Sequence, residues 1–502
     1  MQPADKVENN TAAGRLIFLG EIPKVPDAGH YALSQAQMGN WLMNRFLPDP
    51  GPFNSWFTEE VPVLDPDLAV RAVMEVIRRH EIFRTTFGEI DGEPGQVVHP
   101  AEKFAGAVTK IKSPEKVADC VKALESEARD HRFDFRTGPL FYVKIVEAAG
   151  GFVVLFNMHH VLTDAWSNNI IRQELYSAYQ VLVSANADPL PEPPVQFRDF
   201  SAWHRALYTG MLPEAFRRYW FRFSGSRIPD SDLTELFSGS KRPSDSYEGE
   251  LIAQLRAHLK PMEARYERMF LGVIGKVEMK ESGVYYFAVP HGVLRRLKTL
   301  AGAGGFSLFQ LLIGSLHLTV FHLTGNPDSV IGVNMAMRNN DALRNMIGFM
   351  VNTVLVRNLV QTGDSTLENL SRMAWDTMEA FDFGFYPFER VLKDLDLPFS
   401  AVSKIFVNMP NTTEDQMTFI RDFAGKHLEG GRHIGYFDLD LHIVEEKNGI
   451  KIYCEYKKHL FRPQQIAFWA EVWTELLRRI GEDAEQLPAE LFAGLPTPPP
   501  DL

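Results

Sequence analysis

Apolar side chains recur at every third or fourth residue in several long segments, the spacing that places them on one face of an α-helix. In residues 66–80, for example, Val70, Val73 and Ile77 share one face. The same reasoning predicts a series of helices, over residues 31–46, 66–80, 116–131, 166–183, 292–301, 306–323, 365–381 and 463–479.

Shorter runs rich in Val, Ile and Phe predict β-strands in both halves of the chain. These runs cover residues 81–87, 96–99, 140–147, 151–158, 285–289, 330–334, 353–357, 404–408, 438–444 and 450–456. Because both halves mix helices with strands, we expect an α/β or α+β protein with two lobes of comparable size.

The two lobes are separated by a segment of different composition. Residues 228–250 are rich in Ser, Asp, Pro and Gly, which is typical of a linker. We therefore expect a polar N-terminal extension (1–28), an N-terminal lobe (29–227), the linker (228–250), a C-terminal lobe (251–487) and a Pro-rich tail (488–502). The last residues of the tail, 495–502, should be extended or disordered.

Composition and charge narrow the function classes. The 502 residues are 45% hydrophobic and 23% charged, which is ordinary globular usage. The net charge of −12 argues against binding to nucleic acid or to an anionic membrane. The two cysteines, Cys120 and Cys454, form no CxxC pair, so a disulfide scaffold, a zinc ribbon and an iron–sulfur site lack ligands.

One segment has the length of a membrane span. Residues 306–325 carry no charged side chain, but they include Gln310, His317 and His322. The three- and four-residue spacing of the leucines favours a buried helix of a large soluble protein. The N-terminal residues are polar and lack the apolar core of a signal peptide, so we expect a cytoplasmic protein without a membrane segment.

The candidate chemistry lies where a predicted strand runs into a loop and then a helix. His159 and His160 end the strand, and Asp164 opens the helix. A neutral imidazole at such a junction can accept a proton near pH 7. Other interpretations stay open, since Asp164 fits a helix N-cap and the histidines fit a buried and a surface residue. A zinc site would need a third ligand nearby, and no phosphate-binding, dinucleotide or serine-hydrolase motif occurs.

The run HHVLTDAWS at residues 159–167 resembles the HHxxxDG motif of condensation domains from non-ribosomal peptide synthetases. Further stretches resemble the other motifs of that family in the expected order. They are LSQAQMGNWL (33–42), RHEIFRTTF (79–87), FDFRTGPL (133–140), FRDFSAW (197–203), IGFMVNTVLVR (347–357) and YPFERVL (386–392). The resemblance therefore covers nearly the whole chain, from about residue 31 to about residue 480.

The resemblance implies a fold and a reaction. The fold would be a V-shaped pseudo-dimer of two chloramphenicol-acetyltransferase-like lobes, with a central tunnel and the histidine loop at their junction. A donor carrier protein would present an acyl or peptidyl thioester on its phosphopantetheine arm, and an acceptor amine, carrier-bound or free, would attack it to form an amide. The protein would bind no cofactor or metal of its own, and we expect a monomer.

The resemblance also implies roles for single residues. His160 would deprotonate or position the acceptor amine, whereas His159 and Asp164 would be mainly structural. Asp164 would pair with Arg338 of the second lobe and tie the lobes together. Arg84, Trp203 and Asn352 also match motif positions. For each of them a packing role is the better interpretation.

Three features depart from the family pattern. One is the sixth motif, which reads DFGFYPFE (382–389) instead of the usual HQxxPFE. Ala165 stands where the family usually has Gly, which would add a methyl group to the tunnel and disfavour a positive φ. Residues 242–281 form a longer stretch between motifs than we expect, so they are interpreted as an insertion with a surface helix at 251–268.

Other functions of the same fold stay open. They are an ester-forming condensation with a hydroxyl acceptor, a transfer to a free soluble amine, a CoA-dependent acyltransferase and a non-catalytic docking domain. The histidine motif argues against the docking domain.

Overall fold

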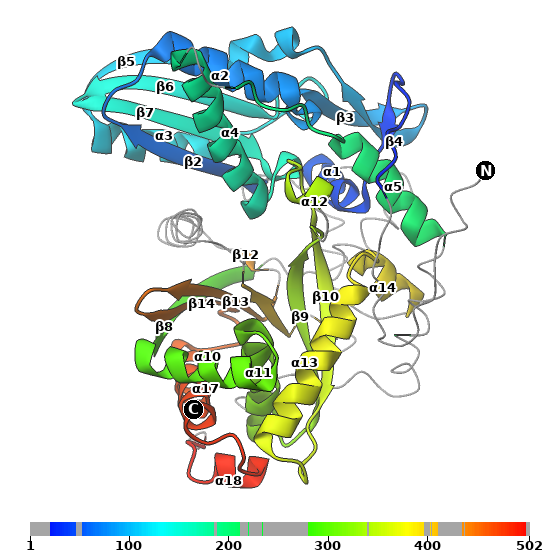
Figure 1. Ribbon diagram of the computed structural model, residues 1–502, viewed down its shortest axis with the longest axis vertical. Helices are drawn as coiled ribbons and strands as arrows, with labels where there is room; N and C mark the ends of the chain where they lie inside the picture. Colours follow the sequence, from blue (N-terminus) through cyan, green and yellow to red (C-terminus); the bar gives the residue numbers. More distant parts are fainter. Residues whose placement is uncertain are drawn as a thin grey trace.

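The computed structural model describes residues 21–46, 53–184, 188–210, 219, 233, 280–338, 341–395, 402, 404–409, 434–435 and 437–497. These residues form two lobes, one above the other in Figure 1, each with a β-sheet and helices packed on it. The mixed α/β fold class is therefore confirmed. The predicted linker lies outside the described residues except for Leu233, and the predicted helix at 251–268 lies wholly outside them.

The main sheet of the N-terminal lobe has the strand order β2-β7-β6-β5. Neighbouring strands are antiparallel except β5 and β6, which are parallel and joined through α3. Side chains alternate along β7, so that Val153 and Leu155 pack on α3 while Phe156 and Met158 join the main core on the other face. The elements of this layer are β2 (Asn54–Val61), β5 (Val108–Lys116), β6 (Phe141–Ala149), β7 (Gly151–His159), α2 (Pro66–Arg79), α3 (Val117–Asp130) and α4 (Ala165–Val183).

A small second sheet in this lobe has the order β1-β4-β3. The helix predicted from residue 31 begins at Gln35, because Tyr31 and Ala32 pair with β4 and the Ser34 hydroxyl accepts the amide of Gln37. The strand predicted at 81–87 begins with a short 3-10 helix instead. The elements are β1 (Tyr31–Ala32), α1 (Gln35–Phe46), η3 (Glu81–Arg84), β3 (Thr85–Ile90), β4 (Glu93–Val98), η4 (Ala101–Ala107) and α5 (Phe197–Thr209).

The C-terminal lobe is built on a seven-stranded sheet of order β10-β9-β11-β13-β14-β8-β12. Helices α10, α11, α13 and α17 pack on one face of it (Figure 1). The strands are β8 (Lys280–Pro290), β9 (Asp328–Ala336), β10 (Val351–Leu359), β11 (Ile405–Asn408), β12 (Ile434–Gly435), β13 (Leu439–Glu446) and β14 (Gly449–Lys457). The helices are α10 (His291–Gly304), α11 (Leu308–Thr324), α12 (Asp341–Arg344), α13 (Thr366–Asp382), α14 (Phe388–Asp394), α17 (Pro463–Glu482) and α18 (Pro488–Phe492).

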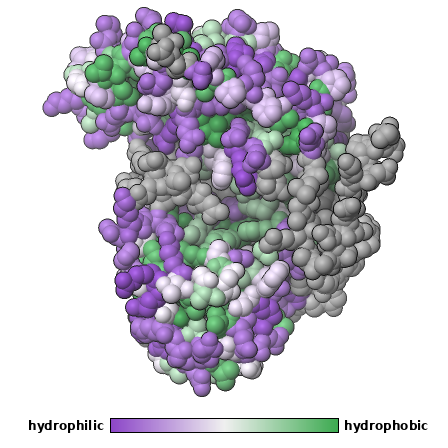
Figure 2. Space-filling view, in the orientation of Figure 1, coloured by the Kyte–Doolittle hydropathy of each residue, from purple (hydrophilic) through white to green (hydrophobic). Residues whose placement is uncertain are grey.

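The segment of membrane-span length forms α11, a mostly buried helix of the C-terminal lobe. Within the described part of the chain, no single helix is both long and apolar enough to cross a membrane, and only α10 and α11 taken together, bent by 103°, meet those two criteria. On the face seen in Figure 2, both lobes carry mainly hydrophilic side chains.

The predicted Pro-rich tail starts with a packed helix. Helix α18 lies inside residues 488–502, and its Leu491 is fully buried. The Arg479 guanidinium of α17 donates to the carbonyls of Leu491 and Ala493, at 3.0 and 2.6 Å. Residues 488–493 therefore pack on the lobe, because an apolar residue and two backbone carbonyls find partners on α17. They precede residues 495–502, for which the extended chain was expected.

Candidate active site

The two adjacent histidines lie at the end of β7 but in different surroundings. The His159 ring is 1% exposed and packs edge-on against Phe135, with ring centroids 4.6 Å apart. Its Nδ1 accepts the Val161 amide at 3.0 Å. Burial, assisted by the neighbouring His160, lowers the pKa of His159 to about 3. His159 is therefore a neutral packing residue under the loop.

His160 lies in the short 3-10 helix η5 (His160–Leu162) and is only half-buried. Its Nδ1 lies 2.6 Å from the carbonyl oxygen of Thr163. Because a carbonyl oxygen can only accept, Nδ1 carries the proton, and the lone pair of the neutral ring is at Nε2. The ring stands edge-on to Phe349 of the C-terminal lobe, with centroids 5.0 Å apart. Among the described residues none bonds to Nε2, so the basic nitrogen is available to a substrate.

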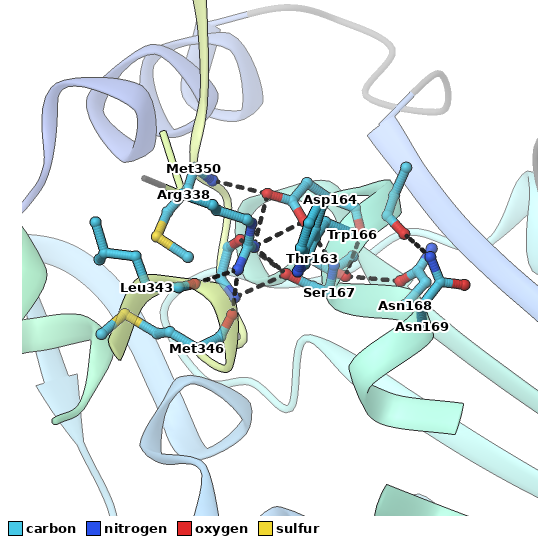
Figure 3. A network of polar contacts seen from close by, with 12 residues as sticks. Thr163, Asp164, Trp166, Ser167, Asn168, Asn169, Arg338, Leu343, Met346 and Met350 are labelled. Atoms are coloured by element: carbon cyan, nitrogen blue, oxygen red, sulfur yellow. Dashed lines mark hydrogen bonds and ion pairs between the residues drawn. The ribbon is translucent and has the colours of Figure 1, made fainter. Parts of the chain in front are cut away.

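Asp164 has two roles at the start of α4 (Figure 3). Its Oδ1 accepts the Ser167 amide at 2.7 Å, which caps the helix. Both carboxylate oxygens also accept from Nη2 of Arg338, at 2.9 Å each, and Oδ2 accepts the Met350 amide at 3.1 Å. Burial alone would raise the pKa of Asp164, but the Arg338 charge and the bonds from Ser167 hold it below its usual value.

Arg338 follows β9 and uses the rest of its guanidinium to shape the loop before β10. Nη1 donates to the carbonyls of Leu343 and Met346, at 2.8 and 2.6 Å. Nη2 also donates to the Ser167 hydroxyl at 2.8 Å. The expected pairing of Asp164 with Arg338 is thus present, and it joins α4 of one lobe to the β9–β10 loop of the other (Figure 3).

Ser167 is a residue of this network that the sequence did not single out. Its hydroxyl donates to the Gly348 carbonyl at 3.0 Å and accepts the Gly348 amide at 3.1 Å. Gly348 is itself pressed against the N-terminal lobe, since a Cβ there would lie 1.8 Å from Cδ2 of Phe197. The only sequence signal for Ser167 is its place three residues after the capping Asp164.

Ala165 is the first residue of α4 and is half-buried. Among the described residues other than glycine, Asp91 alone has a positive φ. The expected conflict between Ala165 and a positive φ therefore does not arise, and alanine fits the helical backbone at this position.

The other residues at motif positions bond to backbone carbonyls or pack on aromatic side chains. Arg84 donates to the His99 carbonyl at 2.8 Å inside the N-terminal lobe. The Asn352 amide donates to the carbonyls of Gly384 and Tyr386, at 2.7 and 2.8 Å, and fixes the segment before α14.

Helix α5 makes a further contact between the lobes. Trp203 is 7% exposed and packs edge-on against Phe385 of the C-terminal lobe. His204, which the sequence analysis did not identify, bonds through Nε2 to the Phe385 carbonyl at 2.6 Å. Burial lowers the pKa of His204 to about 4, so this ring is the neutral donor of a contact between lobes.

Comparison with known proteins identifies the family of the chain. The model of the condensation-domain family matches residues 27–261 and 276–493. One of the linear gramicidin synthase proteins of Brevibacillus parabrevis is 27% identical over 91% of this chain, which covers 6% of that protein. Phosphinothricin tripeptide synthetase PhsB of Streptomyces viridochromogenes is 27% identical over 85% of the chain, which covers 34% of it. The chain thus spans less than a tenth of the gramicidin synthase proteins that it matches.

Solved structures share the fold. The condensation domain from the monacolin K polyketide synthase MokA has a TM-score of 0.70 at 15% identity, over 93% of this chain and 100% of that one. The X-domain in its complex with OxyB from teicoplanin biosynthesis has a TM-score of 0.68 at 18% identity, over 94% of this chain and 98% of that one. By its family match over most of its length, the chain belongs to the condensation-domain family.

Proposed function

We propose that this protein is an acyltransferase that joins an acceptor amine to an acyl or peptidyl thioester and releases an amide. Condensation domains catalyse this type of reaction in non-ribosomal peptide synthesis. The observation that carries the proposal for this chain is the state of His160. Its Nδ1 is held by the Thr163 carbonyl, which leaves Nε2 as the free basic nitrogen between the lobes.

The reaction balances with one imidazole. The neutral acceptor nitrogen attacks the thioester carbon, and Nε2 of His160 accepts a hydrogen bond or the proton from it. The tetrahedral intermediate then collapses, the carbon–sulfur bond breaks, and the thiolate of the phosphopantetheine arm leaves with a proton. The contact from Nδ1 to the Thr163 carbonyl stabilises a positive charge on the ring while it holds that proton.

The contacts around Asp164 support this role by fixing the loop. A misplacement of about 1 Å can cost roughly a hundredfold in rate, so a loop that presents a base needs rigid support. Asp164, Ser167 and Arg338 supply it from both lobes at once. In this proposal His159, Asp164 and Arg338 are positioning residues, and only His160 touches the reacting atoms.

We propose the same organisation of partners that the sequence predicts. Lobes 29–227 and 251–487, joined by residues 228–250, would enclose a tunnel with the donor carrier at one end and the acceptor, carrier-bound or free, at the other. The protein would act as a cytoplasmic monomer, without a resident cofactor, on substrates held by phosphopantetheine arms.

The test is a reconstituted reaction followed by mass spectrometry. The purified chain is mixed with candidate acyl-carrier thioesters and a panel of amines and alcohols. The proposal predicts an amide product that depends on His160. If esters are the only products, the protein is an ester-forming condensation enzyme instead. Equal rates with acyl-CoA and acyl-carrier donors would assign a CoA-dependent acyltransferase, and no product from any pair would favour a docking role.

A further inference from the structure

A second cluster of polar side chains lies on the sheet of the C-terminal lobe. Asp440 of β13 stands directly opposite Glu455 of β14, and His442 lies two residues further along β13 on the same face. Leu439 and Leu441 alternate with them and are buried in the core. The cluster therefore occupies the sheet face opposite to the one covered by α10, α11 and α17 (Figure 1).

The three side chains bring their ligand atoms close together. One oxygen of Asp440, one oxygen of Glu455 and a ring nitrogen of His442 all lie within 4.8 Å of one another. His442 Nε2 is 3.6 Å from Asp440 Oδ2. Ligand atoms about 2.1 Å from a tetrahedral zinc ion are roughly 3.4 Å apart. Small rotations of these side chains would thus bring all three atoms to bonding distance from one ion.

One carboxylate oxygen of the cluster lacks the hydrogen bond that a buried carboxylate normally accepts. Oδ1 of Asp440 is buried and accepts no hydrogen bond within the described part of the chain. Like charges directly opposite on antiparallel strands are destabilising, and Asp440 faces Glu455 in this way. A cation bound between Asp440 and Glu455 would reduce the repulsion between their carboxylates.

Two lysines form ion pairs with Asp438, which precedes Asp440 by two residues. Nζ of Lys404 and Nζ of Lys457 lie 3.8 and 3.3 Å from the carboxylate of Asp438. Both ammonium groups lie near the Asp438 carboxylate, and the Lys457 amide also donates to the Asp438 carbonyl. The two carboxylates of the cluster therefore face each other beside a histidine, whose Nε2 is 3.6 Å from Asp440 Oδ2.

We propose that Asp440, His442 and Glu455 bind a divalent transition-metal ion of the zinc type, through one imidazole nitrogen and two carboxylate oxygens, with water completing the coordination. A mixed nitrogen and oxygen ligand set suits zinc and its neighbours in the first transition row. The ion would tie β13 to β14. This site stands apart from the proposed function and does not depend on it.

The test uses the purified full chain after removal of metals with a chelator. Titration with Zn²⁺ alone is followed by calorimetry, and the wild type is expected to bind one ion per chain. The variants Asp440→Asn, His442→Ala and Glu455→Gln are each expected to bind at least about tenfold more weakly. Glu445→Gln is the matched control, because Glu445 is on the same strand but pairs with Lys298. It should bind like the wild type.

Two results would overturn the proposal. One is the absence of saturable binding to the wild type, in which case the cluster shares a proton instead. The other is equal affinity of the wild type and of all three variants, which would place the ion elsewhere. X-ray absorption of the zinc-loaded wild type identifies the atoms that coordinate the ion, whether or not the variants fold. One imidazole and oxygen ligands are expected, and sulfur ligands or no imidazole would contradict the site.

Discussion

At the residue scale, the difference between the two histidines follows from the alternation of side chains along β7. His159 falls on the side covered by aromatic rings, and its pKa is lowered to about 3. His160 falls on the other side, where the strand ends and the C-terminal lobe begins. A sequence motif identifies both rings, but only the surroundings decide which one can act as a base.

Truncation of His159 tests its packing role. We expect His159→Ala to lower the free energy of unfolding by about 2–4 kcal/mol, because it removes a buried ring and leaves a cavity. Urea unfolding at pH 7 measures this loss. The control is Tyr176→Ala, since Tyr176 is 68% exposed and its removal should change stability by less than about 0.5 kcal/mol. Equal stability of His159→Ala and the wild type would contradict the packing role.

The ion pair of Asp164 and Arg338 yields a second prediction at this scale. Asp164→Asn keeps the shape of the side chain but leaves the Arg338 charge buried and unpaired, which should cost about 3–5 kcal/mol. The matched control is Asp341→Asn, because the exposed pair of Asp341 with Arg344 should contribute at most about 1 kcal/mol.

The pH dependence of this pair has a definite sign. The pKa of Asp164 is lowered in the folded protein, so the carboxylate stabilises the fold at neutral pH. This contribution is fully present above about pH 4, the usual carboxyl pKa, and is lost as the pH falls further. Unfolding curves between pH 7 and pH 3 should show this loss in the wild type and not in Asp164→Asn. Parallel curves for the two proteins would contradict the assignment.

At the element scale, the long helices were predictable because their apolar spacing depends only on neighbouring residues. Helices α2, α13 and α17 begin within one residue of their predicted starts. Strand β2 was not predicted, since its polar residues alternate irregularly and its strand form depends on pairing with β7. Helix α5 was noticed only as a motif, although its buried residues recur at the same three- and four-residue spacing.

In the candidate site, too, the residues whose role depends on distant parts of the chain were not predicted. The histidine loop and Arg338 followed from motifs whose order along the chain resembles a known family. Ser167 and His204 did not follow, because each bonds to a residue about 180 positions away. Asp440 and Glu455 are likewise an ordinary polar pair in the sequence. Only the register of β13 and β14 makes them face one another.

The close approach of Gly348 to α5 gives a prediction at the element scale. We expect Gly348→Ala to destabilise the protein by about 1–3 kcal/mol, because a Cβ there would overlap the buried Phe197 ring. Gly302→Ala is the control. Gly302 lies in helix α10 with no atom near its Cβ position, so alanine should stabilise by about 0.5–1 kcal/mol. Thermal unfolding of both variants measures these changes, and an unchanged Gly348→Ala would contradict the close contact.

At the scale of the whole molecule, the contacts between the described parts of the two lobes include two sets that contain ionisable side chains. Asp164 and Arg338 form one beside His160, and Trp203 and His204 of α5 form the other at Phe385. Both sets put buried ionisable or polar groups between the lobes. The stability of the fold should therefore depend on pH through these contacts.

His204 provides the measurement of that response. Its pKa is lowered to about 4, so the neutral ring stabilises the fold fully above about pH 6.5 and less as the pH falls toward 4. The loss should be roughly 1.4 kcal/mol per pH unit over that range. His204→Gln should be less stable than the wild type at pH 7 and lose less stability on acidification. The same slope in both proteins would show that His204 is not the responsible group.

The central claim is that Nε2 of His160 serves the acyl transfer while the rest of the motif holds it in place. The most direct measurement compares the wild type with His160→Ala for amide formation from a carrier-bound thioester, by mass spectrometry, with circular dichroism and urea unfolding on the same samples. The account predicts an unchanged fold and stability, with a rate lower by at least about a hundredfold. A folded His160→Ala protein that forms the product at nearly the wild-type rate would contradict it.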